Sequence, residues 1–197
     1  MNIICNNCVG ARMYECAHKQ FPNPFMWNAI NAYDFIKLIN EFDTIDLNKP
    51  NIELEQYLNQ DKQSVLITLD NDVKLHFIHY MLDKTKDVLI KEKNTNILYK
   101  DILKYATDKW FNRLKRLNEE PTFMFSFNYM KTTNDVYEDV LYKLLNITNK
   151  QIIIICHDCV DIQQNYSGNI RVIRLDSQTM SLDTGLSKIL INNYINL

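Results

Sequence analysis

The hydrophobic pattern of the chain predicts strands and helices that alternate. Short apolar runs typical of buried strands are followed by segments whose apolar residues recur at helical spacing. The predicted strands span residues 3–5, 64–68, 73–79, 122–127, 151–155 and 171–175. The predicted helices span residues 9–20, 32–42, 99–118, 134–145 and 182–194. Residues 83–95 are rich in charge and predict a solvated loop or a short helix.

Strand–helix alternation at both ends of the chain favours an α/β protein, because parallel strands need helical crossovers. Residues 64–68 and 73–79 are separated by a short polar turn, which indicates a central β-hairpin. We therefore expect a three-layer sandwich with a mixed, partly parallel sheet. No repeat or linker divides the sequence, so residues 1–197 are predicted to form one domain.

The composition excludes several classes of protein. Hydrophobic residues make up 46% of the chain and aromatic residues 11%, which argues for a folded globule and against disorder. A net charge of -2 predicts no strong attraction to nucleic acid or to an anionic membrane. The chain has neither a secretory signal nor an apolar run that would span a bilayer, so we expect it in the cytoplasm.

Cys8 is the strongest candidate for chemistry. It follows the first predicted strand, at the point where the first helix should begin. Unpaired N–H groups and the positive end of the helix dipole favour a thiolate at such a place, and a thiolate is a nucleophile. We expect the neighbouring Asn7 and Gly10 to contact substrate, with the backbone N–H groups of residues 8–10 holding an oxyanion.

Five cysteines, an odd number, indicate free thiols in a reducing compartment. The Cys5/Cys8 and Cys156/Cys159 pairs have zinc-ligand spacing, but the gap between the pairs is far longer than in a zinc ribbon. Each pair also follows an apolar strand, where cysteine commonly packs as a small hydrophobe. We therefore expect no metal and no other cofactor. Because ligands bind beyond the carboxyl ends of strands, His157 is a candidate to share a crevice with Cys8.

Two histidines lie on one predicted strand, at positions 76 and 79. Side chains alternate between the faces of a strand, so His76 and His79 point apart and cannot both serve one thiol. His79 shares the more apolar face with Leu75 and Phe77, which makes it the better partner for Cys8 in a cleft. The alternative for His79 is a hydrogen-bonded core histidine, and His76 is typical of the surface.

Arg113 and Arg116 are three residues apart on a predicted helix and therefore share a face. Two guanidinium groups in that arrangement can bind a phosphate or carboxylate. The alternative is a solvated cationic face that pairs with Glu119 and Glu120.

Residues 21–27 form an aromatic loop with two prolines. We expect Phe25 to fill the core, while Trp27 is a candidate to stack on a sugar. The sequence has no Walker loop, GxGxxG fingerprint, HExxH or GxSxG elbow, so it gives no support to function by those routes.

The order of these segments resembles a bacterial family of exopolysaccharide biosynthesis proteins whose biochemical function is unknown. That family opens with a strand and Ser-Asn-Asn-Cys-Trp-Gly-Gly, and the resemblance extends over roughly residues 1–130. The matching runs here are Cys5-Asn6-Asn7-Cys8-Val9-Gly10-Ala11, Asn23-Pro24-Phe25, Asp34-Phe35-Ile36-Lys37, the His76–Tyr80 strand and the Trp110–Arg116 helix. Cys5 in place of serine is a departure that argues against a metal ligand at that position.

A more distant similarity to papain-like cysteine peptidases implies that Cys8 is a nucleophile with His79, or else His76, as its base. The leading hypothesis is thus an enzyme of surface polysaccharide biosynthesis that uses Cys8 to attack an acyl or similar donor. Arg113 and Arg116 would bind the donor's phosphate, and other polysaccharide-assembly proteins would be partners. The alternatives are a glycosyltransferase that uses a nucleotide-sugar without covalent catalysis, and a non-catalytic member of a capsule-assembly complex.

Overall fold

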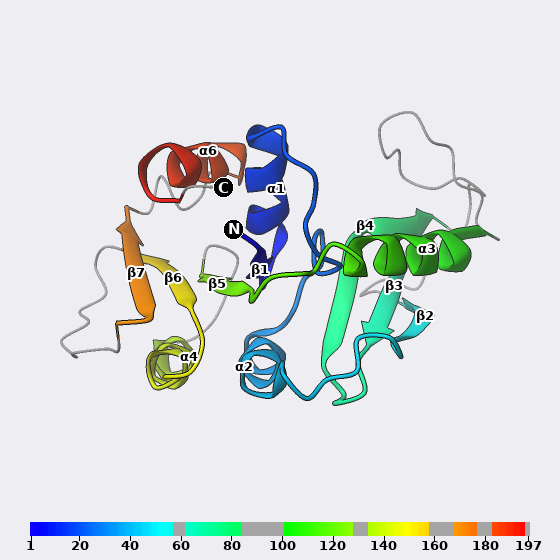
Figure 1. The fold of residues 1–197 in the computed structure, drawn as a ribbon, viewed down its shortest axis with the longest axis horizontal. Coiled ribbons are helices and arrows are strands. Elements are labelled where there is room, and N and C mark those ends of the chain that lie inside the picture. Colours follow the sequence, from blue (N-terminus) through cyan, green and yellow to red (C-terminus); the bar gives the residue numbers. More distant parts are fainter. Residues whose placement is uncertain (57–61, 84–100, 128–133, 158–167, 177–182, 196–197) are drawn as a thin grey trace.

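The computed structural model describes residues 1–56, 62–83, 101–127, 134–157, 168–176 and 183–195, and it confirms the α/β class (Figure 1). The first sheet and its helices comprise β1 (Ile3–Cys5), α1 (Cys8–Cys16), α2 (Ala32–Glu41), β5 (Thr122–Ser126), α4 (Asn134–Leu145), β6 (Ile152–His157), β7 (Ile170–Leu175) and α6 (Asp183–Asn193). The second sheet comprises β2 (Asn51–Gln56), β3 (Lys62–Thr68) and β4 (Lys74–Asp83), and α3 (Ile102–Leu114) lies beside it.

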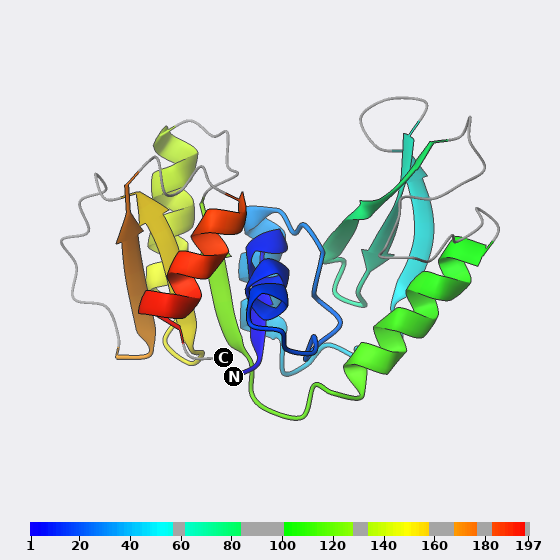
Figure 2. The ribbon, with the colours of Figure 1, turned by 90° about the horizontal axis from the view of Figure 1, so that it is seen from above.

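The first sheet is parallel and has the strand order β1-β5-β6-β7. Its strands are short apolar runs, and residues 152–156 of β6 are buried throughout. Helices α1 and α6 cover one face, and α2 and α4 cover the other (Figures 1 and 2). The predicted three-layer sandwich is therefore present around the parallel sheet.

The predicted hairpin is also present, but its strands form a second, antiparallel sheet of order β2-β3-β4 rather than joining the first. The sequence pattern identifies strands but not their partners, and here β4 pairs outside its own sheet through an isolated bridge between Ala29 and His76. Strand β2 was not predicted, although Ile52 and Leu54 alternate with glutamates as a half-buried strand requires.

Helix α1 ends at Cys16, four residues before its predicted end, because His18 adopts a left-handed conformation with φ 52°. The N–H of Lys19 donates to the carbonyl of Tyr14, and that of His18 donates to Glu15. This is the Schellman pattern that closes a helix. Glycine usually occupies the left-handed position, and its absence here removed the usual stop signal from the sequence.

Trp110 attaches α3 to the rest of the molecule. Its side chain is fully buried, its indole N–H donates to the carbonyl of Leu47 at 3.0 Å, and its ring lies edge-on to Phe25 at 5.6 Å. The helix is thereby fixed to two connecting loops. Residues 83–95 lie almost entirely outside the described residues, so the predicted loop there stays a prediction.

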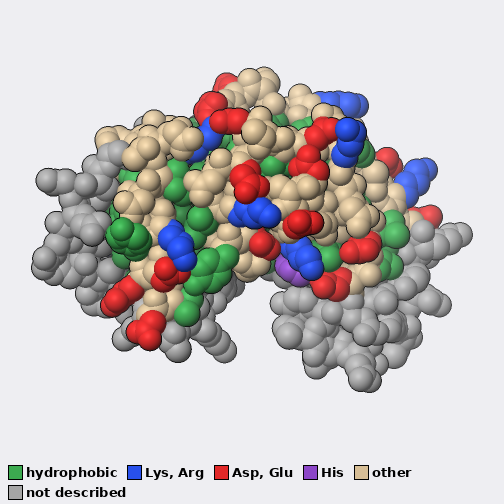
Figure 3. Space-filling view, turned by 90° about the horizontal axis from the view of Figure 1, so that it is seen from below, with side chains coloured by type: hydrophobic (Ala, Val, Ile, Leu, Met, Phe, Trp, Pro, Cys, Tyr) green, Lys and Arg blue, Asp and Glu red, His purple; other side chains and the backbone are tan. Residues whose placement is uncertain are grey.

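The surface carries mixed charge. Figure 3 shows lysine and arginine side chains interspersed with aspartate and glutamate over the face seen from below, which agrees with the small net charge. Among the described residues, no helix combines the length and the apolar character that a bilayer span requires.

Gly10 lies where α1 crosses the end of β1. A Cβ atom at this position would be 2.7 Å from the Cβ of Cys5, closer than side chains approach one another. The Cys5 Cβ is fixed to the backbone of a buried strand, so it cannot move aside without moving β1. The predicted contact between Gly10 and substrate is untested, but the structure gives this glycine a packing role.

We expect Gly10→Ala to lower the free energy of unfolding by about 1–3 kcal/mol, because overpacking outweighs the helix propensity of alanine. Urea denaturation measures the change. Gly168→Ala is the control, since no atom lies within 4 Å of the Cβ it would add. Equal stability of the two variants would contradict this account.

Candidate functional site

Cys8 is the first residue of α1, as its placement after the first strand predicted. Asn7 caps the helix with extended backbone angles, and its side-chain oxygen accepts a hydrogen bond from the N–H of Val9 at 3.0 Å. Cys8 is partly exposed. The thiol therefore stands at the positive end of a helix dipole, beyond the carboxyl end of β1.

Asn6 fixes the turn that carries Cys8. Its side chain forms a two-way pair with the backbone of Ser126, accepting from the N–H at 2.8 Å and donating to the carbonyl at 3.2 Å. Its own N–H donates to Met124, and its carbonyl accepts from Ile30 at 2.8 Å. Asn7 donates to the same Ser126 carbonyl at 3.3 Å. Both asparagine side chains are buried, so these bonds are shielded from water.

Cys5 differs from Cys8 in its exposure to solvent. It is buried, and burial raises the pKa of its thiol to about 11 against the opposing effect of backbone hydrogen bonds from Asn7, Gly10 and Asn6. Cys5 therefore stays a thiol at neutral pH. The N–H of Val9 donates to the side chain of Asn7, so the oxyanion site predicted at the N–H groups of residues 8–10 stays a prediction.

Among the described residues, no group of three or more His, Cys, Asp or Glu side chains is arranged to hold a metal ion. Cys156 is buried in β6, and Cys159 lies outside the described residues.

The described side chains at the start of β4 follow the predicted alternation. Leu75 and Phe77 are buried, whereas Lys74 is exposed. His79 belongs to β4 by its backbone, and its side chain lies outside the described part, as does that of His157 at the end of β6.

His76 is half-buried and is linked to the Cys8 turn through the backbone. It exchanges two hydrogen bonds with Ala29, at 2.8 and 2.9 Å, and the next residue, Ile30, donates to Asn6. Two successive backbone pairings, His76 with Ala29 and Ile30 with Asn6, thus connect β4 to the turn that carries Cys8. Paired backbone segments lie about 5 Å apart. The Nδ1 atom of His76 is 3.2 Å from a carboxylate oxygen of Glu55, in a direction that makes no hydrogen bond.

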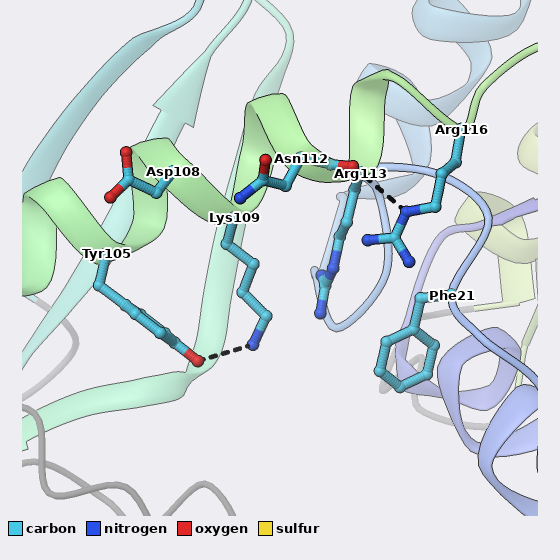
Figure 4. A pocket seen from close by; sticks show the side chains of 7 residues that line it. All are labelled: Phe21, Tyr105, Asp108, Lys109, Asn112, Arg113 and Arg116. Carbon is cyan, nitrogen blue, oxygen red and sulfur yellow. Dashed lines mark hydrogen bonds between the residues drawn. The ribbon is translucent and has the colours of Figure 1, made fainter.

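Arg113 and Arg116 line a groove of about 400 Å³ between α3 and the loop that follows α1 (Figure 4). Arg113 is only 2% exposed, donates to the carbonyl of Met26 at 2.9 Å and lies 5.0 Å from the centre of the Phe21 ring. The alternative of a solvated cationic face is therefore wrong for Arg113. Glu120 instead pairs with Lys150 at 2.8 Å.

Trp27, the residue predicted as a candidate to stack on a sugar, is buried. Its ring lies 4.8 Å from the guanidinium of Arg12 and packs edge-on against Phe21 at 6.2 Å. Its φ of 69° is a strained value for a bulky side chain. Phe25 is 2% exposed, as its predicted core role requires. Trp27 thus supports the ring of Phe21 at the groove.

The structure does not bring this groove to Cys8. Cys8 begins α1, and Phe21 follows the far end of that helix, about 13 Å away along its nine residues. Asn23 holds the loop at the start of β1 through bonds to Asn2 and to the carbonyl of Ile3. Figure 2 likewise shows the C-terminal end of α3 on the side of the chain's N-terminus.

Asn6, Tyr105 and Lys109 were not predicted as site residues, and Phe21 was predicted only as part of the aromatic loop 21–27. Tyr105 and Lys109 could have been found, since they precede Arg113 at intervals of four residues on the same helix. Asn6 carried no comparable signal, because its partners are more than a hundred residues away.

Residues 1–94 match the model of a family described as a domain of unknown function, DUF1919. No curated protein matches the chain. The matched region contains Cys8 and His76, whereas α3 with Arg113 and Arg116 lies outside it.

We expect Asn6→Asp to lower the free energy of unfolding by about 1–3 kcal/mol at neutral pH, because a carboxylate cannot donate to the carbonyl of Ser126. The deficit should shrink in acid, where a protonated carboxyl donates again. Urea denaturation at two pH values measures both effects. Asn118→Asp is the control at an exposed position, and an equal loss in both variants would argue against the buried pair.

Proposed function

We propose that the protein is an enzyme of surface polysaccharide biosynthesis that uses Cys8 as a nucleophile on an acyl or similarly activated donor. The observation that carries this proposal is the position of Cys8, a partly exposed thiol on the first residue of α1. Ligands of open α/β sheets bind beyond the carboxyl ends of the strands, and Cys8 lies there. The link to polysaccharides rests on the resemblance found in the sequence.

In this reaction the Cys8 thiolate attacks the carbonyl carbon of the donor. A carbon–sulfur bond forms, the donor's leaving group departs with a proton, and a thioester remains on Cys8. An acceptor hydroxyl or water then attacks the thioester and releases the thiolate. His79, or else His76, accepts the thiol proton and returns it to the leaving group. Glu55 lies where it would stabilise a protonated His76.

A glycosyltransferase without covalent catalysis is the second candidate. The separation of the cationic groove from Cys8 favours it, because a nucleotide-sugar bound in the groove would not need the thiol. A non-catalytic member of a capsule-assembly complex would require neither feature. Replacement of Cys8 distinguishes these alternatives from the proposal.

Cys8 and Cys16 form a natural comparison, because both are partly exposed and they occupy opposite ends of α1. We expect iodoacetamide to modify Cys8 about tenfold faster than Cys16 at neutral pH, since the helix N-terminus favours the thiolate. Peptide mass spectrometry on the native wild-type chain measures both rates, with buried Cys5 as the unreactive reference. Equal rates at the two ends of α1 would contradict an activated Cys8.

p-Nitrophenyl acetate is the probe for acyl transfer, since it releases one p-nitrophenolate for each thioester formed. We expect a burst from the wild type and from Cys16→Ser, and no burst from Cys8→Ser. His79→Asn or His76→Asn should slow the burst, which identifies the base. A full burst from correctly folded Cys8→Ser would overturn the proposal.

A further inference from the structure

The groove beside α3 has the form of a ligand site that is separate from Cys8. Tyr105, Lys109 and Arg116 project from the helix toward the same side, and Phe21 closes the groove from the loop after α1 (Figure 4). A volume of about 400 Å³ lies within the usual range for small-molecule pockets.

The lining of the groove is cationic although the whole chain is slightly acidic. Lys109, Arg113 and Arg116 contribute three positive groups against the one carboxylate of Asp108. Arg116 uses its Nε atom to donate to the carbonyl of Asn112 at 3.2 Å. In the described part of the chain no carboxylate lies within ion-pair distance of Arg116, so its outer N–H groups are available to an anion.

Arg113 gives the groove a fixed positive charge. Its burial removes most of the water that would screen the guanidinium, and its bond to Met26 holds the group in place. Its contact with Phe21 also holds that ring, which makes a further, edge-on contact with Trp27. An incoming anion thus meets charges and an aromatic ring that are already positioned, which lowers the entropic cost of binding.

We propose that this groove binds a phosphate ester whose adjoining group is a planar ring, with a nucleoside diphosphate as the fitting class. Arg116 and Lys109 contact the phosphates, Arg113 supplies the fixed charge, and the base stacks on Phe21 or Tyr105. This inference goes beyond the proposed thiol chemistry and does not depend on it, because the length of α1 separates the groove from Cys8.

The test is calorimetric titration of the full chain with uridine diphosphate, adenosine diphosphate, pyrophosphate and uridine at low salt. We expect a nucleoside diphosphate to bind more tightly than pyrophosphate or uridine. Arg116→Gln and Lys109→Gln should each weaken that binding about tenfold. Lys115→Gln is the matched control, because it removes the same charge from an exposed position of the same segment outside the groove.

Phe21→Leu separates ring binding from phosphate binding, since it keeps an apolar side chain but removes the aromatic face. It should weaken binding of the nucleoside diphosphate and leave that of pyrophosphate unchanged. Cys8→Ser should bind all four probes like the wild type, so failure of the thiol proposal leaves this result standing. The inference would be overturned if no phosphate compound bound saturably, or if Arg116→Gln and Lys115→Gln lost equal affinity. Its ring specificity would be overturned if pyrophosphate bound as tightly as a nucleoside diphosphate.

Discussion

The side-chain amide of Asn6 is the interaction on which the arrangement of the molecule depends. Strand β1 has only three residues, so the backbone pairing with β5 ends before the chain turns into α1. Asn6 continues that pairing with its side chain, which bonds both the backbone N–H and the backbone carbonyl of Ser126. Its backbone carbonyl receives Ile30 at the same point. Because the amide is buried, each lost bond would leave a polar group without water to replace its partner.

Hydrogen bonds hold the second sheet and α3 to the rest of the molecule at several places, among them a bond from the N–H of Lys74 in β4 to the carboxylate of Asp34 in α2. On one side, Ile30 and Ala29 connect Asn6 to His76 of β4 by backbone hydrogen bonds. On the other, α3 is fixed by Trp110 to Leu47 and by Arg113 to the loop before Ala29. The two attachments meet in residues 21–30, the loop that also contains the strained Trp27. That loop therefore contributes to the position of the hairpin relative to the parallel sheet, and strain within it is offset by the contacts on both sides.

The hydrophobic pattern was enough to predict the type of most described elements, because burial on one face imposes a period of two or of 3.6 residues. It could not predict which strands pair, since pairing depends on partners far along the chain. The hairpin was accordingly assigned to the wrong sheet, although its turn was found. The end of α1 was missed for a local reason, because the left-handed residue there is His18 rather than glycine.

The candidate sites divide in the same way. The place of Cys8 on the first residue of a helix is a local property, and the sequence was sufficient to predict it. The surroundings of Arg113 are not local. The spacing put Arg113 on one helix face with Arg116, but Arg113 also lies about one turn after Trp110. In the structure Arg113 is buried, like Trp110. A guanidinium there must be compensated, and the carbonyl of Met26 and the ring of Phe21 both contribute to that compensation. Arg113 therefore joins α3 to the loop and also adds a cationic group to the lining of the groove, so one residue serves both the packing of α3 and the attraction of anionic ligands.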